Sequence, residues 1–253
     1  MIMAFADVKQ SLFRYTEHSA GGDFEMEKYL FAGVSLQNRR ATNMDSLLIK
    51  PSRINKEDSL LAVVCDGVGS LNDGGYASGM AARMLGDWFE KLKFIEDIGT
   101  GLKDFISELN LNLIEQAEQK TKDTASTLSA LILIKNKYII VHLGDSRIYS
   151  YTNNCLTLLT KDDISEEGKL TAYIGRNRQI YPQYYDGDAE GKTFLLCSDG
   201  LYKRMDEYYL SNLMESMGNT KEDLQNVIEL LPQHVIDRGE KDNITIALIK
   251  GMF

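Results

Sequence analysis

Four aspartates stand at the ends of strongly apolar stretches that read as β-strands. Three follow such a stretch and one precedes it: Asp66, Asp145, Asp199 and Asp242. In an antiparallel sheet the end of one strand lies beside the start of its neighbour, so all four acids can share one edge of a sheet or sheet pair. Converging carboxylates repel each other unless a cation neutralises them. Hard divalent cations such as Mg²⁺ and Mn²⁺ prefer such oxygen ligands, so the pattern indicates a divalent-cation site.

Each of these aspartates also has a simpler interpretation. Asp-Gly is a common turn dipeptide, and an aspartate at a strand end often caps a loop, so for any one of them a turn is the better explanation. Four together, each beside an apolar strand, favour the cation site. Arg40 lies in an early loop, where an arginine is usually a surface charge. Beside a metal cluster, however, it could bind a phosphate through two hydrogen bonds.

The elements that would position these residues follow from apolar periodicity. A spacing of 3.6 residues predicts helices near 75–92, 98–121 and 222–238, with a kink or restart at Pro232. Short β-branched or apolar runs predict strands at Leu30–Ser35, Ser46–Ile49, Leu60–Cys65, Thr127–Ile134, Tyr138–Leu143, Arg147–Tyr151, Phe194–Cys197 and Ile244–Ile249. Lys135-Asn136-Lys137 predicts a hairpin between two of them. Strands paired as hairpins together with long amphipathic helices predict sheets covered by helices.

Composition limits the class of protein. The chain has 253 residues and a formal net charge of −9, which argues against a nucleic-acid partner. It has no linker or repeat, so we expect one domain over 1–253, with the first 28 residues as a tail or an extra strand. Three scattered cysteines, no signal peptide and no run near the ~20 apolar residues of a membrane span predict a cytoplasmic protein without a membrane partner.

Other hydrolytic chemistries fit the sequence poorly. A cysteine-dependent phosphatase needs an arginine after Cys and five further residues, and no cysteine has one at that spacing. An aspartyl-phosphate enzyme needs Asp-x-Asp after a strand, but Asp186 and Asp188 lie in a polar stretch that reads as a turn. There is no Gly-x-x-x-x-Gly-Lys phosphate loop. His142 falls in an apolar run and is expected in the core.

A series of short motifs resembles the bacterial branch of the PPM phosphatases, older name protein phosphatase 2C, from about Phe31 to Ile249. In the family's order they are Gly33-Val-Ser, Arg40-Ala-Thr-Asn43-Met-Asp45, Val63-Val-Cys-Asp66-Gly67-Val-Gly69, Gly74-Gly-Tyr-Ala77-Ser78, Ser126-Thr127, Gly144-Asp145-Ser146-Arg147, Leu196-Cys-Ser-Asp199-Gly200-Leu201 and Asp242-Asn243-Ile-Thr245. The resemblance implies an α+β fold: a four-layer αββα sandwich of two antiparallel β-sheets packed face to face with helices on the outside.

The resemblance also implies an activity, the hydrolysis of phosphoserine and phosphothreonine in phosphoproteins. A hydroxide held between two Mn²⁺ or Mg²⁺ ions would attack phosphorus. Asp66 would bridge both ions, Gly67 would lend its backbone carbonyl, and Asp199 and Asp242 would each hold one ion. Asp145 would hold a third, weaker ion. The implied partners are a phosphoprotein substrate and a cognate serine/threonine kinase.

Two further roles follow from the resemblance. Arg40 would bind the substrate phosphate, and Asp45 would orient metal-bound water. Glycine after Asp66 fits a backbone that approaches a metal ion closely.

The sequence departs from the family pattern at a few places. Met44, Val68 and Ser70 replace residues common in relatives, and the mobile flap that many bacterial relatives carry is shortened to 163–170. The short flap predicts an open cleft and weakens the case for a third ion. No core ligand is lost, so we expect activity. The alternative is a catalytically weak or inactive regulatory or binding module with the same fold.

Overall fold

Two antiparallel sheets form the centre of the computed structural model, which describes residues 13–15, 28–68, 74–120 and 124–252. Sheet A has six strands in the order β1 (Phe13–Tyr15), β2 (Tyr29–Leu36), β11 (Ile244–Gly251), β10 (Thr193–Cys197), β7 (Arg147–Thr152) and β8 (Cys155–Leu158). Sheet B has five, in the order β3 (Asp45–Ile54), β4 (Glu57–Asp66), β5 (Leu128–Ile134), β6 (Lys137–Leu143) and β9 (Gln183–Asp188). Every neighbouring pair is antiparallel.

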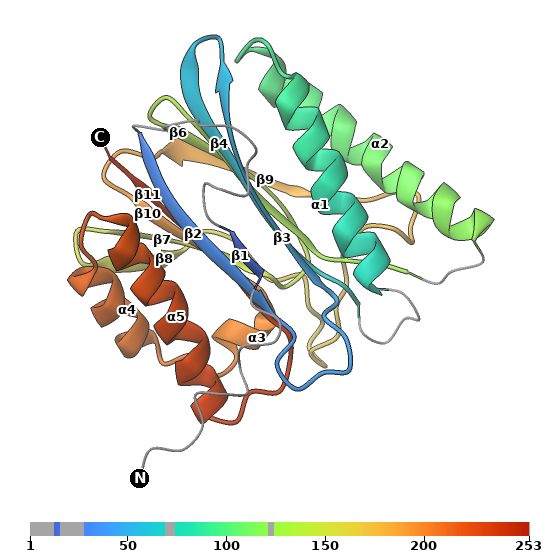
Figure 1. Cartoon of the computed structure of the whole chain (residues 1–253). Coiled ribbons are helices and arrows are strands. Elements are labelled where there is room, and N and C mark those ends of the chain that lie inside the picture. Colours follow the sequence, from blue (N-terminus) through green and yellow to red (C-terminus); the bar gives the residue numbers. More distant parts are fainter. Residues whose placement is uncertain (1–12, 16–27, 69–73, 121–123, 253) are drawn as a thin grey trace.

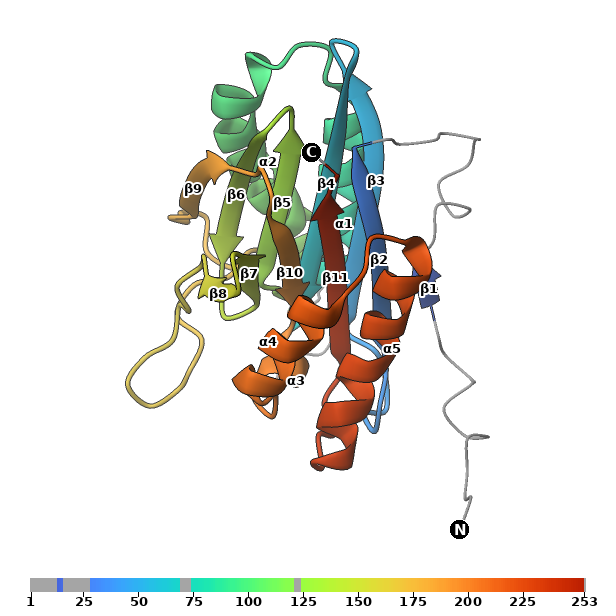
Figure 2. The ribbon, with the colours of Figure 1, turned by 90° about the vertical axis from the view of Figure 1, so that its left-hand side faces the viewer.

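Helices cover the outer face of each sheet (Figures 1 and 2). The long helices α1 (Gly74–Lys91) and α2 (Asp97–Gln119) pack on sheet B. The short α3 (Asp199–Tyr202), α4 (Glu207–Ser216) and α5 (Lys221–Asp237) lie on sheet A. The implied four-layer αββα sandwich is therefore confirmed. Within the described ranges, no helix is long and apolar enough to cross a membrane.

Alternate side chains of the central strands enter different cores, and this arrangement holds the layers together. In β4, Leu61, Val63 and Cys65 face α1 and α2. The intervening side chains of the same strand enter the core between the sheets. Successive side chains of a strand point to opposite faces, so a strand that is apolar at every position supplies both cores at once.

The predicted elements are found, most with small shifts of their ends, but the strand predicted at Ser46–Ile49 is longer, because β3 continues to Ile54. The hairpin is confirmed: β5 and β6 pair through Ile134 and Lys137, and Lys135 takes a positive φ of 53° in the turn. Pro232 lies inside α5, which runs through it as one helix. The expected helix end at residue 121 lies outside the described residues.

Sequence reasoning missed two edge strands and two helices. β8, β9, α3 and α4 were not predicted, and the interpretation of Asp186 and Asp188 as a turn is wrong, because both lie in β9 paired with β6. The side chains of this edge strand are at most partly buried, so its sequence looks polar. Near the N-terminus, β1 forms an extra strand beside β2. Residues 1–12 and 16–27 lie outside the described ranges, as do Gly69 and Ser70.

Candidate active site

The four strand-end aspartates converge at one end of the sandwich. Asp66 ends β4, Asp145 lies between β6 and β7, Asp199 follows β10, and Asp242 precedes β11. All four line one cavity of about 310 Å³, together with Arg40, Gly67 and a few neighbours. The convergence predicted from the antiparallel arrangement is therefore found, and it involves both sheets.

This carboxylate cluster is electrostatically unfavourable by itself. Burial raises the pKa of Asp66 well above its ordinary value, and the charges of Asp45, Asp199, Asp145 and Asp242 raise it further. Asp66 therefore resists ionisation unless a cation joins the cluster. Their hard oxygen donors and their mutual repulsion fit divalent ions such as Mn²⁺ or Mg²⁺.

Burial also raises the pKa of Asp145 to about 6, with a further contribution from Asp199. This second acid therefore experiences the same shortage of positive charge.

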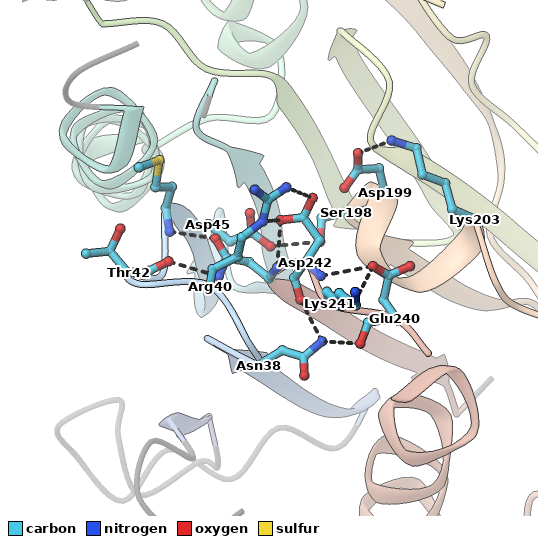
Figure 3. Close-up of polar contacts among 12 residues, drawn as sticks. Asn38, Arg40, Thr42, Asp45, Ser198, Asp199, Lys203, Glu240, Lys241 and Asp242 are labelled. Carbon is cyan, nitrogen blue, oxygen red and sulfur yellow. Dashed lines mark hydrogen bonds and ion pairs between the residues drawn. The ribbon is translucent and has the colours of Figure 1, made fainter. Parts of the chain in front are cut away.

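Two side-chain cations contact the cluster (Figure 3). Arg40 donates to Asp242 twice, at 2.7 Å from Nε to Oδ1 and 2.5 Å from Nη2 to Oδ2. Burial acts to raise the pKa of Asp242, but the bonds from Arg40 lower it overall. The Lys203 ammonium donates to Oδ2 of Asp199. Within the described ranges, no three acidic, histidine or cysteine side chains are already arranged to hold a metal ion.

Asn243 fixes the loop that carries Arg40. Its side-chain amide donates to the carbonyls of Gln37 and Thr42, at 2.9 and 3.0 Å. Its Oδ1 accepts the backbone N–H of Met44 at 2.9 Å. Sequence reasoning quoted the Asp-Asn pair but gave the asparagine no role, although an amide beside a predicted ligand was the available signal.

Asp45 lies behind the cavity rather than in its lining. It stands opposite Asp66 in the β3–β4 register and is 9% exposed. Its Oδ2 accepts a hydrogen bond from Ser198 Oγ at 2.8 Å. Burial raises its pKa to about 7. Asp45 instead lines a larger cavity of about 440 Å³ between β3 and α1, which has no comparable acidic cluster, so we place the site in the smaller cavity.

Two glycines allow the backbone segments of the site to approach each other. A Cβ on Gly67 would lie 2.5 Å from the carbonyl oxygen of Gly74 and 2.7 Å from that of Met44. A Cβ on Gly200 would lie 1.9 Å from the carbonyl oxygen of Asn243. Close approach to a metal ion was the expected reason for glycine at position 67. The structure supplies a packing reason that holds without any ion.

His142 is a core residue, as predicted. Its ring is fully buried and makes hydrogen bonds to Ser129 Oγ at 2.8 Å and to the Gly144 carbonyl at 3.0 Å. Nearby, the Thr127 hydroxyl accepts the backbone N–H of Asp66 at 2.9 Å. These buried contacts hold the backbone on which Asp66 and Asp145 stand.

The segment 163–170, where we expect a shortened flap, contains a compact turn. The backbone N–H of Ser165 donates to the carbonyl of Lys169 at 2.8 Å, and Gly168 takes a positive φ of 73°. Of this turn, only Leu170 lines the cavity, together with Met44 and Val68 from elsewhere in the chain.

Comparison with known proteins places this sandwich, with its acidic cavity at the strand ends, in a known class of phosphatase. The family model described as protein phosphatase 2C matches residues 32–231. This chain belongs to the protein phosphatase 2C family, as its motifs indicate.

Individual relatives agree with this assignment. The serine/threonine phosphatase stp of Listeria welshimeri is 30% identical over 222 residues, which are 78% of this chain and 86% of that protein. The serine/threonine phosphatase Stp1 of Staphylococcus aureus has a similar fold, with a TM-score of 0.75 at 22% identity over 90% of this chain and 95% of that one. The catalytic domain of PstP, crystallised with two manganese ions, has a TM-score of 0.74 at 24% identity over 89% of this chain and 99% of that one.

Proposed function

We propose that this chain hydrolyses phosphoserine and phosphothreonine in phosphoproteins at a site that holds two Mn²⁺ or Mg²⁺ ions. The observation that carries the proposal is the convergence of four carboxylates and Arg40 on one cavity of about 310 Å³. A relative is named a serine/threonine phosphatase, and the PstP structure is described with two manganese ions.

The cavity residues have distinct roles in this proposal. Asp66 would contact both ions and Gly67 would offer its carbonyl, while Asp199 and Asp242 would each hold one ion. When bound, such ions lower the pKa of a coordinated water and offset charge on the phosphoryl oxygens. Asp45, one strand away from Asp66, would help to orient that water.

Arg40 would bind the phosphate. Its side chain is 58% exposed, and its planar guanidinium can leave Asp242 for the phosphate oxygens once an ion takes over that carboxylate. The arginine and the ions would then stabilise the charge on the equatorial oxygens during in-line attack.

In this proposal the whole of 1–253 would act as one domain in the cytoplasm. Its partners would be phosphoprotein substrates and a kinase whose products they are, without nucleic acid or membrane. A short turn at 163–170 would leave the cleft open to a phosphorylated segment of a folded protein.

The test is release of phosphate from a phosphothreonine peptide with and without Mn²⁺. We expect Mn²⁺-dependent turnover that Asp199→Asn abolishes. Asp188→Asn is the matched control, because Asp188 also pairs with a lysine but lies exposed on β9, and it should behave as native. Metal binding without turnover in the native protein would favour the regulatory module instead.

A further inference from the structure

Lys203 is a cation built into the acidic site from the helix that carries Asp199. It stands four residues after Asp199, directly beyond the end of α3, and its ammonium donates to Asp199 Oδ2 (Figure 3). The side chain of Asp199 is 15% exposed and that of Lys203 is 55% exposed. The contact therefore joins a nearly buried acid to a lysine that reaches in from the rim.

The backbone under Lys203 is well fixed. Its N–H donates to the carbonyl of Asp199 at 3.1 Å. The ring of Tyr202 lies under the Arg147 guanidinium, 3.7 Å from its central carbon to the ring centroid. Arg147 in turn makes an ion pair with Asp162 at 2.8 Å. The position of the lysine thus follows from the fold rather than from the exposed ion pair alone, which would be a weak constraint.

Lys203 acts on more than one acid. Burial acts to lower its pKa, but the carboxylates of Asp199, Asp145 and Asp66 outweigh burial and raise it. Conversely, Lys203 lowers the pKa of Asp145, against the opposing effects of burial and Asp199. Its positive charge therefore acts on both Asp145 and Asp199, which line the same cavity.

A carboxylate can bind two cations at once, one through each oxygen. Each oxygen of an ionised aspartate accepts independently, so Asp199 can bind the ammonium through Oδ2 and leave Oδ1 for a divalent ion. The oxygen that Lys203 occupies is then denied to any further ion shared with Asp145. The ammonium is part of the chain, so its supply does not depend on the Mn²⁺ concentration, whereas the occupancy of a weakly held ion does.

We propose that Lys203 is a positioning residue whose ammonium takes the place of a third divalent ion between Asp145 and Asp199, so that the site holds two ions. This inference rests on the proposed function, because it presumes that the other two ions bind. It also gives Asp145 a role that needs no ion, as a second partner for the charge of Lys203.

The experiment counts bound Mn²⁺ by isothermal titration calorimetry and by metal analysis after equilibrium dialysis. We expect two ions for the native protein and for Lys203→Arg, which keeps the charge. Lys203→Met should bind a third ion, and the double variant Lys203→Met/Asp145→Asn should bind two again. Lys137→Met is the matched control, and this variant should bind two ions. Lys137 also pairs with an aspartate, Asp188, at 2.6 Å, but it lies at the start of β6, whereas Asp145 follows the other end of that strand.

The outcomes separate this inference from the proposed function. Three ions in the native protein, or two in Lys203→Met with unchanged affinities, would overturn the role of Lys203 and leave the phosphatase proposal intact. No bound Mn²⁺ in the native protein would overturn both. Melting curves in EDTA show whether each variant is folded, so a lost ion is not confused with a lost fold.

Discussion

At the residue scale, the site consists of acids that repel each other until cations join them. Asp66 shows this most strongly, because burial and four neighbouring acids raise its pKa. An acid whose pKa rises on folding takes up protons as the protein folds. Its contribution to stability is therefore complete below the ordinary value of 3.8 and is lost as the pH rises toward the folded pKa.

Asp66→Asn should therefore stabilise the ion-free protein near neutral pH. In EDTA at pH 8 we expect a higher melting temperature than native, and the difference should shrink toward pH 4, where Asp66 is protonated. With Mn²⁺ the order should reverse, because only the native protein gains stability from bound ions. Equal melting temperatures for native and variant across this pH range in EDTA would contradict the electrostatic argument.

Replacing Arg40 should affect turnover and Mn²⁺ binding in different ways. Arg40→Met should lower kcat/KM for a phosphothreonine peptide by about 100-fold, a usual cost of removing one group that stabilises developing charge. It should also strengthen Mn²⁺ binding, because Asp242 loses the cation that now occupies it. Arg39→Met, the exposed neighbour, is the control for both measurements. Unchanged turnover would exclude Arg40 from phosphate binding.

At the element scale, strand ends and glycines bring the acids together. Asp45 and Asp66 meet across the β3–β4 register, and Gly200 lets the start of α3 approach Asn243. These contacts explain how much the sequence predicts. Apolar strands such as β4 and β10 are found from their residue types, and their terminal aspartates come with them.

Elements with little burial are not predicted in this way. β9, with the sequence QYYDGD, has no buried residue, so nothing in its pattern separates it from a loop. Lys203 is missed for a different reason. Its contact with Asp199 depends on the start of α3, which is too short for a periodic signal.

Gly200→Ala tests whether this packing sets the geometry of the site. The added methyl would lie 1.9 Å from the Asn243 carbonyl, so α3 must move and carry Asp199 away from Asp242. We expect at least a 10-fold weaker affinity for Mn²⁺ by calorimetry, in line with the cost of disturbing residues that orient ligands. Gly99→Ala is the control, because a Cβ there meets nothing within 4 Å in α2, and native affinity is expected. Native affinity in Gly200→Ala would show that α3 tolerates the shift.

At the scale of the whole molecule, the two sheets supply one site between them. β4 and β6 of sheet B and β10 and β11 of sheet A all end or begin at the same cavity. A site shared in this way depends on the buried contacts behind it. The hydrogen bonds of His142 to β5 and to the Gly144 carbonyl are among these contacts.

His142 should make stability depend on acid pH. Burial lowers its pKa below the ordinary value of 6.5, so the imidazole is protonated more readily in the unfolded chain than in the folded protein. Its contribution to stability is therefore present above pH 6.5 and is lost as the pH falls toward the folded pKa. His142→Gln should cost about 1–2 kcal/mol at pH 8 through lost hydrogen bonds. It should also flatten the decline between pH 6.5 and 5, as measured by urea unfolding in EDTA, whereas a decline as steep as native would refute the assignment.

The most direct test of the account follows Mn²⁺ binding and phosphate release from a phosphothreonine peptide in one titration. If the carboxylate cavity is the catalytic site, turnover should be absent in EDTA and should rise with the occupancy of the bound ions. Asp66→Asn should lose both signals together. Full occupancy without turnover, or turnover that persists in EDTA, would contradict the central claim.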